Sequence, residues 1–155
     1  MHLLDAIDRR IIFELQKDAR ISNQELAERV DLSPSPCLRR VRRLEEEGII
    51  TGYSAVIDHE KVGMPISAYV RFAISQHDAV TRAEVEERLH ELPHVVEAYL
   101  LAGGEEDYLI KVATESFADY ENFLRTELAL IPGVASARTT FAYRNIKSGM
   151  PLPLS

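Results

Sequence analysis

The first fifty residues show the apolar periodicity of short amphipathic helices. Apolar side chains recur at about every fourth position in residues 7–15, which predicts a first helix with one buried face. Ser22 followed by Glu25 fits a capping box and predicts the start of a second helix. Ser33 followed by Pro34 predicts the start of a third, with serine as the N-cap and proline in the first turn. A short helix, a turn and a longer helix form the helix-turn-helix arrangement.

The third helix is predicted to have an apolar face and a basic face. Its apolar face is formed by residues at i, i+4 and i+7, which are Cys37, Val41 and Leu44. Arginines on the opposite side can bond to guanine edges or neutralise phosphates in the major groove of DNA. A solvated surface helix is the alternative for any run of charges, but the preceding caps and the turn favour DNA binding. The residues that we assign to DNA contact are Ser33, Ser35, Pro36, Arg39, Arg40, Arg42 and Arg43.

The formal net charge of the 155-residue chain is −7, which on its own argues against a nucleic-acid partner. The charge is unevenly distributed, however. Residues 1–50 contain 9 Arg and Lys against 10 Asp and Glu, whereas residues 51–155 contain 9 against 15. The acidity therefore belongs mainly to the second part of the chain, and a local basic face remains compatible with phosphate binding.

After residue 65, a strand–helix–strand pattern occurs twice. The two copies superpose at an offset of 39 residues, which aligns Leu89 with Leu128, Pro93 with Pro132 and Val95 with Val134. Two such copies with no helix between them predict a ferredoxin-like βαββαβ domain, with both helices on one face of an antiparallel sheet. The predicted fold class is α+β, with a helix-turn-helix domain at residues 1–50, a β-strand hinge and linker at 51–65, and the βαββαβ domain at 66–155.

Alternation along the predicted strands separates two sheet faces. The face expected beneath the helices is mainly apolar: Ile66, Ala68, Val70, Phe72, Tyr108, Ile110, Val112, Val96, Ala98, Leu100, Ala135 and Ala137. The other face mixes aromatic, aliphatic and charged side chains: Tyr69, Arg71, Leu109, Lys111, Val95, Glu97, Tyr99, Leu101, Val134 and Arg138. A mixed face predicts a self-association surface, and a dimer would let two short recognition helices read a palindromic site.

Other kinds of site receive little support from the sequence. Residues 90–94 read HELPH, a literal match to a zinc-protease pattern, but Pro93 is expected to push Leu92 out of helical geometry and so separate the two histidines. The single cysteine, Cys37, allows no internal disulfide and is expected to be a buried apolar residue. The first residues do not resemble a signal peptide, and no apolar run is long enough to cross a bilayer. We therefore expect a cytoplasmic protein that is not an enzyme and uses no metal or cofactor.

With both parts assigned, the chain resembles the leucine-responsive regulatory protein/AsnC family of transcriptional regulators. The resemblance is carried by LDAIDRRIIFELQKDARISNQELAERVDLSPSPCLRRVRRLEEEGIITGYSAVID in the first part, and by AGGEEDYLIKV and LIPGVASARTTFAY in the second. It implies DNA-binding dimers that assemble further, often into octamers, and an amino acid or a related small molecule as effector. It also implies an effector-binding loop at Gly103, Gly104, Glu105, Glu106, Asp107 and Tyr108. In such a loop, glycines let backbone amides approach a carboxylate, and an acidic side chain can meet an α-ammonium group.

Two hypotheses about function follow. The first is a sequence-specific regulator of transcription that binds double-stranded DNA at palindromic promoter sites, is associated with the nucleoid, and senses an amino acid through its oligomeric C-terminal domain. The second is an architectural DNA-binding multimer that is insensitive to effectors. The two hypotheses differ only in whether ligand binding is linked to DNA binding. The tail at residues 146–155 fits either a dimer-bridging arm or a loose end.

Overall fold

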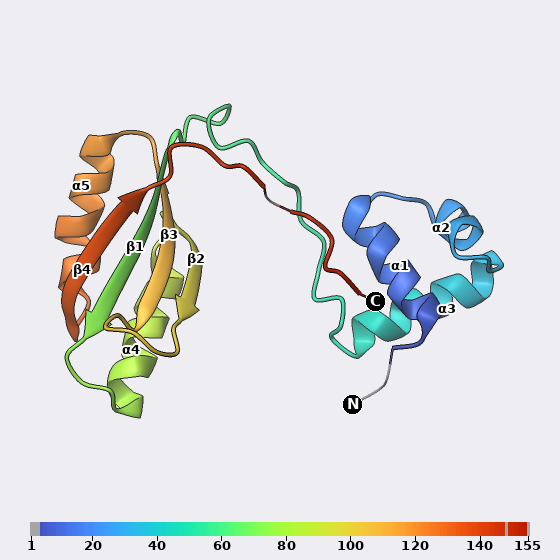
Figure 1. Cartoon of the computed structure of the whole chain (residues 1–155), viewed down its shortest axis with the longest axis horizontal. Helices are drawn as coiled ribbons and strands as arrows, with labels where there is room; N and C mark the ends of the chain where they lie inside the picture. The colour runs from blue at the N-terminus through green and yellow to red at the C-terminus, as the bar shows by residue number, and fades with distance from the viewer. Residues whose placement is uncertain (1–3, 148, 155) are drawn as a thin grey trace. The chain divides into compact units, whose positions relative to one another are not determined.

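The computed structural model describes residues 4–147 and 149–154, and its contacts divide the chain into two units. The helical unit contains Met1–Val56 together with Ile146–Ser155, and the sheet unit contains Ile57–Asn145 (Figure 1). The division after residue 56 falls within the predicted hinge and linker at 51–65. The C-terminal tail is grouped with the helical unit, where the Leu152 N–H donates to Gln16 Oε1 at 2.8 Å.

Three helices form the core of the helical unit, as the sequence predicts: α1 (Ala6–Lys17), α2 (Asn23–Arg29) and α3 (Pro34–Glu46). Their apolar faces meet in one cluster of buried residues: Ile11, Leu26, Ala27, Val30, Cys37 and Leu44. Cys37 is fully buried, as predicted, and its burial raises the pKa of the thiol. A neutral, buried thiol behaves as a small apolar side chain.

The predicted N-caps are at the helix starts, but two of them bond differently from expectation. Ser22 Oγ accepts the backbone N–H of Glu25 at 3.2 Å, whereas the Glu25 carboxylate binds Arg29 instead of completing a capping box. Ser33 is the N-cap of α3 but makes no side-chain cap hydrogen bond. Two of the first three residues of α3 are prolines, which have no N–H, so few donors are left for a cap to satisfy.

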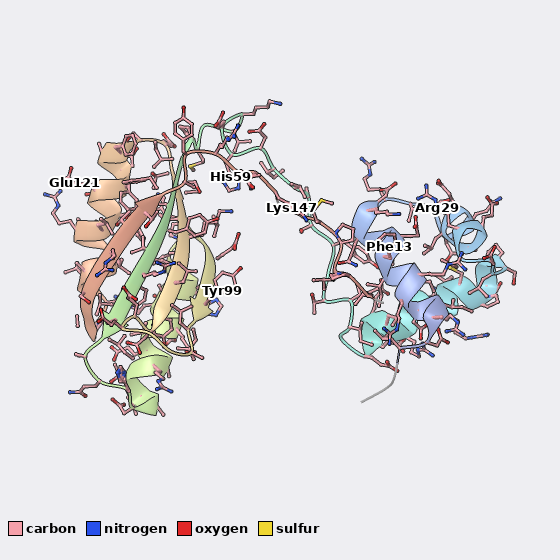
Figure 2. The ribbon with its side chains drawn as sticks, viewed as in Figure 1. Phe13, Arg29, His59, Tyr99, Glu121 and Lys147 are labelled. Carbon is pink, nitrogen blue, oxygen red and sulfur yellow. The ribbon has the colours of Figure 1, made fainter. Side chains whose placement is uncertain are left out.

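The turn between α2 and α3 is held by side chains from α1. Asp31 has a left-handed backbone conformation, with φ of 57°, which Asp tolerates better than most residues. Arg10 donates to Asp31 Oδ2 at 2.9 Å and to the carbonyl of Arg29 at 2.5 Å. The Arg29 guanidinium (Figure 2) in turn binds Glu14 at 2.8 Å. These contacts fix the turn that sets α3 against α2.

The predicted β-strand hinge is not a strand in this structure. Residues 51–58 pair with no other segment among the described residues, and Val56 is 84% exposed. An extended segment becomes a strand only when a neighbour takes up its backbone hydrogen bonds, and sequence alternation alone cannot supply one. Near its start this segment is anchored to α3, because the Tyr53 hydroxyl donates to Glu45 Oε1 at 2.8 Å.

The sheet unit has the predicted βαββαβ order, and its elements are β1 (Ile66–Ile74), α4 (Ala79–Glu91), β2 (Val95–Leu100), β3 (Tyr108–Thr114), α5 (Phe117–Thr126), a 3-10 turn η1 (Leu128–Leu130) and β4 (Val134–Phe141). The strand order is β2-β3-β1-β4, and each neighbouring pair is antiparallel (Figure 1). Residues of both α4 and α5 pack into one core with β1 and β3, so both helices lie on the same face. None of the described helices is long and apolar enough to span a membrane.

The first residues of β2 and β4, which correspond in the two copies, lie on the opposite sheet face from the one predicted. Alternation assigns Val95 and Val134 to the open face, but both pack against the core beneath the helices. The register shifts between Val95 and Glu97 in β2, and opposite Ala73 in the pairing with β4. One extra residue reverses which face the preceding side chain occupies, so strict alternation fails at these positions.

The helices cover the two central strands and leave the edge strands partly uncovered. Val96 and Leu100, which alternation places beneath the helices, are 45% and 56% exposed. Ala98, Ala135 and Ala137 are exposed as well. A hollow of about 440 Å³ lies between α4 and β2, with Glu86, His90 and Tyr108 among its lining residues. The expected apolar face therefore has a buried centre and open flanks.

The N-cap of α4 provides a test of this fold. Asp78 Oδ1 accepts the backbone N–H groups of Val80 and Thr81 at 2.9 and 3.0 Å, and the Thr81 hydrogen bond is the main cause of the lowered pKa of Asp78. We expect Asp78→Ala to lower the free energy of unfolding at pH 7, because α4 loses its capping oxygen; urea denaturation followed by circular dichroism measures the change.

Because the folded pKa of Asp78 lies below its unfolded value, this stabilisation is present at neutral pH and is lost as the pH falls through the folded pKa. The difference between wild type and Asp78→Ala should therefore shrink below about pH 4. Asp78→Ser is the matched control, since serine keeps a capping oxygen and does not titrate. Equal unfolding free energies for wild type and Asp78→Ala at pH 7 would refute the capping role.

Candidate DNA-binding and effector sites

Helix α3 presents a continuous exposed stripe opposite its buried face. Its buried residues, Cys37 and Leu44, belong to the core of the helical unit. The exposed stripe has the i, i+3, i+4, i+7 spacing of one helix face and consists of Ser35, Leu38, Arg39 and Arg42. Ser33 is exposed at the N-cap, and Pro36 is partly buried. Leu38 was not predicted from the sequence, although it is 39% exposed within this stripe.

The four arginines of α3 fall into two pairs. Arg40 donates to Asp5 Oδ2 at 2.6 Å and to Asp8 Oδ1 at 2.7 Å, and Arg43 donates to Asp8 Oδ2 at 2.7 Å. The hydrogen bonds that Arg40 donates, first to Asp5 and second to Asp8, raise the pKa of Arg40. These two guanidinium groups are thus bound to acids at the start of α1.

Arg39 and Arg42 differ from that pair. Both are exposed, and no ion pair or hydrogen bond of either side chain is found among the described residues. A guanidinium without an internal partner keeps all of its donors available for phosphates or for the O6 and N7 atoms of guanine.

The first turn of α3 is held by a residue that the sequence did not single out. Asn23, the first residue of α2, donates from Nδ2 to the carbonyl of Pro34 at 2.9 Å. The sequence feature that could have identified Asn23 is a polar residue directly after a helix N-cap. Asp8 of α1 also reaches α3, which its position in the sequence does not indicate.

The proposed effector loop divides into an exposed part and an internally bonded part. Gly103 and Gly104 have φ of 88° and 109°, conformations that favour glycine, and a side chain there would meet no atom within 4 Å. Glu105 is exposed and Glu106 is partly buried. Backbone and carboxylate groups are therefore accessible at these four positions, and least so at Glu106.

Asp107 is bonded within the fold. Its carboxylate accepts the Ile74 N–H at 2.8 Å, its N–H donates to the Phe72 carbonyl at 2.9 Å, and its carbonyl accepts the Leu101 N–H at 2.7 Å. His77 Nδ1 lies 3.5 Å from its other carboxylate oxygen. Asp107 therefore closes the base of the loop against the end of β1.

Tyr108 is also committed to the interior. Its side chain is 2% exposed, its ring stacks on Phe72 at 5.1 Å between centroids, and its hydroxyl donates to Glu86 Oε1 at 3.2 Å. Burial first, and Glu86 second, raise the pKa of Tyr108 to about 12. Tyr108 and Glu86 both line the hollow between α4 and β2.

Charged groups on the open sheet face adjoin this loop. Arg71 and Arg138 are directly paired residues of β1 and β4, so two positive side chains are neighbours. Arg138 Nη1 lies 3.8 Å from Glu106 Oε1. On the same face, Lys111 binds Glu97 at 3.1 Å, and the Tyr99 hydroxyl (Figure 2) donates to Glu97 at 2.7 Å.

The two histidines of HELPH do not lie on one helical turn. His90 is in the last turn of α4, which ends at Glu91, and Leu92 has left helical geometry with ψ of 111°. His94 lies beyond it, with Nδ1 3.6 Å from Glu127 Oε1. The predicted effect of Pro93 is confirmed, and the described residues contain no group of three side chains arranged to hold a metal ion.

Comparisons with known proteins bear on both units. A family model for winged helix-turn-helix DNA-binding domains matches residues 4–51, and the model for the Lrp/AsnC ligand-binding domain matches residues 67–152. The Bkd operon transcriptional regulator of Pseudomonas aeruginosa is 38% identical over 151 residues, which cover 96% of this chain and 98% of that protein. The leucine-responsive regulatory protein of Rhizobium meliloti is 39% identical over 144 residues, covering 93% and 92% of the two chains.

The chain belongs to the Lrp/AsnC family.

Solved structures agree with this assignment. A transcriptional regulator from Neisseria meningitidis, solved in complex with L-Met, is 34% identical and superposes with a TM-score of 0.91 over 98% of this chain and 97% of that one. AsnC of Escherichia coli is 26% identical and superposes with a TM-score of 0.83 over 95% and 97%. This Lrp/AsnC protein is thus a transcriptional regulator with a helix-turn-helix DNA-binding domain and an α+β ligand-binding domain.

Two of the three acids in the loop, Glu105 and Asp107, lead to separable predictions for this Lrp/AsnC chain. Asp107→Ala removes the acceptor of the Ile74 N–H, so we expect it to lower the free energy of unfolding by about 1–3 kcal/mol. Glu105→Ala is the matched control, since Glu105 is exposed, and it should stay within about 0.5 kcal/mol of wild type. Chemical denaturation of both variants provides the measurement. A fully stable Asp107→Ala would contradict the structural role of this carboxylate.

Proposed function

We propose that this Lrp/AsnC regulator reads palindromic sites in double-stranded DNA by inserting the exposed stripe of α3 into the major groove. The observation that carries the proposal is the exposure of Arg39 and Arg42, while the opposite face of α3 is buried in the core. An arginine near the start of a recognition helix can bond bidentately to guanine, and a second can neutralise a phosphate.

The sequence assigns Ser33, Ser35, Pro36 and all four arginines to DNA contact. The ion pairs of Arg40 and Arg43 favour a narrower surface, in which Arg39 and Arg42 make the main charged contacts. Ser33 and Ser35 are exposed at the helix start, where their short polar side chains suit a phosphate.

The sheet unit is proposed to sense an amino acid or a related small molecule. This proposal draws on the match to the Lrp/AsnC ligand-binding domain and on the L-Met bound to the Neisseria meningitidis relative. In this chain the accessible part of the loop is Gly103 to Glu106, which could place backbone amides against a carboxylate and an acid against an ammonium group. We assign Asp107 and Tyr108 to shaping this loop from below.

Self-association is proposed to complete the regulator. The open sheet face exposes Tyr69 and Tyr99 beside complementary charges, and residues 51–58 are extended without a partner strand among the described residues. Both features suit a second copy of the chain, and dimers of this kind can assemble further into octamers. A dimer also supplies two recognition helices for a palindromic site. We place this regulator in the cytoplasm in association with the nucleoid, and we assign it no catalytic activity and no cofactor.

The DNA-reading surface can be tested with the tightest duplex recovered by the wild-type chain from a randomised pool. We expect Arg39→Ala and Arg42→Ala each to weaken binding by roughly 10-fold or more, as measured by fluorescence anisotropy. Arg88→Ala is the charge-matched control, because Arg88 lies on α4 and pairs with Glu91 at 3.0 Å. Unchanged affinity in both α3 variants would show that α3 is not the reader.

Ligand linkage separates the two functional hypotheses. A thermal-shift screen of the full chain against the common amino acids should raise the unfolding temperature for at least one of them, and that amino acid should change DNA affinity. Glu106→Gln should reduce the shift, while Glu121→Gln on the distant surface of α5 (Figure 2) should leave it unchanged. A complete absence of shifts, together with DNA binding that ignores every amino acid, would support the architectural alternative instead.

A further inference from the structure

Asp8 is a buried charged residue that reaches from α1 to the recognition helix. Only 2% of the residue is exposed, and the other buried polar residue found in the described chain is Thr114 of the sheet unit. Asp8 lies in the first turn of α1, where its N–H donates to Asp5 Oδ1 at 2.8 Å and its carboxylate accepts the Asp5 N–H at 3.3 Å. These capping bonds hold the Asp8 side chain in one orientation.

Both carboxylate oxygens of Asp8 bind arginines of α3. Oδ1 accepts from Arg40 Nη1 and Oδ2 accepts from Arg43 Nη2, each at 2.7 Å. Arg40 Nη1 also donates to Asp5 Oδ2 at 2.6 Å, and Arg43 Nε lies 3.9 Å from Glu47 Oε1. Two carboxylates and two guanidinium groups thus form a cluster between α1 and α3, which consists of Asp5, Asp8, Arg40 and Arg43.

The physical chemistry of this cluster favours an internal role for both arginines. A buried carboxylate is strongly unfavourable unless it is paired and hydrogen-bonded, and here two guanidinium groups fulfil that requirement. Drawing Arg40 or Arg43 out toward a phosphate would leave Asp8 underpaired. The cluster is also close to electrically neutral, so it adds little net attraction for DNA.

The position of the cluster fixes how α3 is rotated about its own axis. Successive residues of an α-helix are about 100° apart, so the pair Arg40 and Arg43 lies about 100° around α3 from the pair Arg39 and Arg42. Anchoring the first pair to Asp8 therefore determines where the second pair points. A small rotation of a reading helix would misplace bidentate contacts, which depend on geometry.

We propose that Asp8 is a positioning residue for DNA recognition, which anchors Arg40 and Arg43 so that Ser35, Leu38, Arg39 and Arg42 face the groove. Arg40 and Arg43 then act as internal anchors and not as phosphate contacts. This inference rests on the proposed reading of DNA by α3, and it assigns different roles to arginines that are nearly adjacent in sequence.

The salt dependence of binding distinguishes anchors from contacts. The logarithm of the binding constant falls linearly with the logarithm of the salt concentration, and each phosphate that the protein neutralises contributes about 0.9 to the steepness of that slope. For the full chain on the selected duplex, we expect Arg39→Gln or Arg42→Gln to make the slope shallower. Arg40→Gln and Arg43→Gln should weaken binding but leave the slope at its wild-type value.

A slope for Arg40→Gln or Arg43→Gln that falls as much as that for Arg39→Gln would overturn the inference while leaving α3 as the reader. If none of the four substitutions changes either affinity or slope, the proposed function itself fails. The two failures are therefore distinguishable. Folding of each variant is confirmed by circular dichroism at the temperature of the binding measurement.

Rescue by an apolar replacement provides a second readout. Asp8→Ala leaves two guanidinium groups without their buried acid, and we expect binding to weaken on the order of 10-fold or more. Replacing the whole cluster by apolar residues of similar size, as Asp8→Leu with Arg40→Met and Arg43→Leu, should restore folding and most of the affinity with an unchanged salt slope. A folded triple variant that binds weakly and with a reduced slope would show that these arginines contact phosphate. If the triple variant does not fold, the slopes of the single variants decide the question.

Discussion

Burial of the apolar face of α3 against α1 and α2 is the constraint on which the DNA-binding half of this regulator depends. Once Cys37 and Leu44 are inside the core, the directions of the other side chains of α3 are fixed, because the helix is rigid. The exposed stripe then follows from the spacing of residues along the helix. The ion cluster centred on Asp8 adds a polar restraint to this apolar one, and both restrain the rotation of α3 about its axis.

In the sheet unit, α4 and α5 leave part of the sheet surface exposed. Two helices of the lengths seen here cover β1 and β3 well, but they leave the edge strands and one whole face of the sheet open. Open strand edges and a mixed polar and aromatic face are costly in a solitary protein, since they invite uncontrolled pairing. Here they are the surfaces on which ligand binding and self-association can be built. In the proposed function, these surfaces connect a small-molecule site to the assembly that presents α3 to DNA.

The sequence was sufficient for the elements whose determinants are local. Caps, prolines and apolar periodicity predicted α1, α2 and α3, and the internal duplication predicted the βαββαβ order of the sheet unit. It failed where the determinant lies elsewhere in the fold. Register shifts moved Val95 and Val134 to the core, and the predicted strand in the hinge has no neighbour among the described residues with which to pair.

Side-chain partners were the least predictable part of the candidate sites. Sequence spacing placed four arginines within one short segment but could not show that Arg40 and Arg43 meet acids more than thirty residues away. Likewise, the resemblance to the family placed Asp107 in the effector loop but could not show that its carboxylate holds the end of β1.

Methylation interference at guanine N7 across the selected duplex tests directly whether Arg39 and Arg42 of α3 contact guanine edges. We expect methylation of specific major-groove guanines to block wild-type binding, and this interference to disappear at one guanine per half-site in Arg39→Ala. An interference pattern identical in wild type, Arg39→Ala and Arg42→Ala would contradict this expectation.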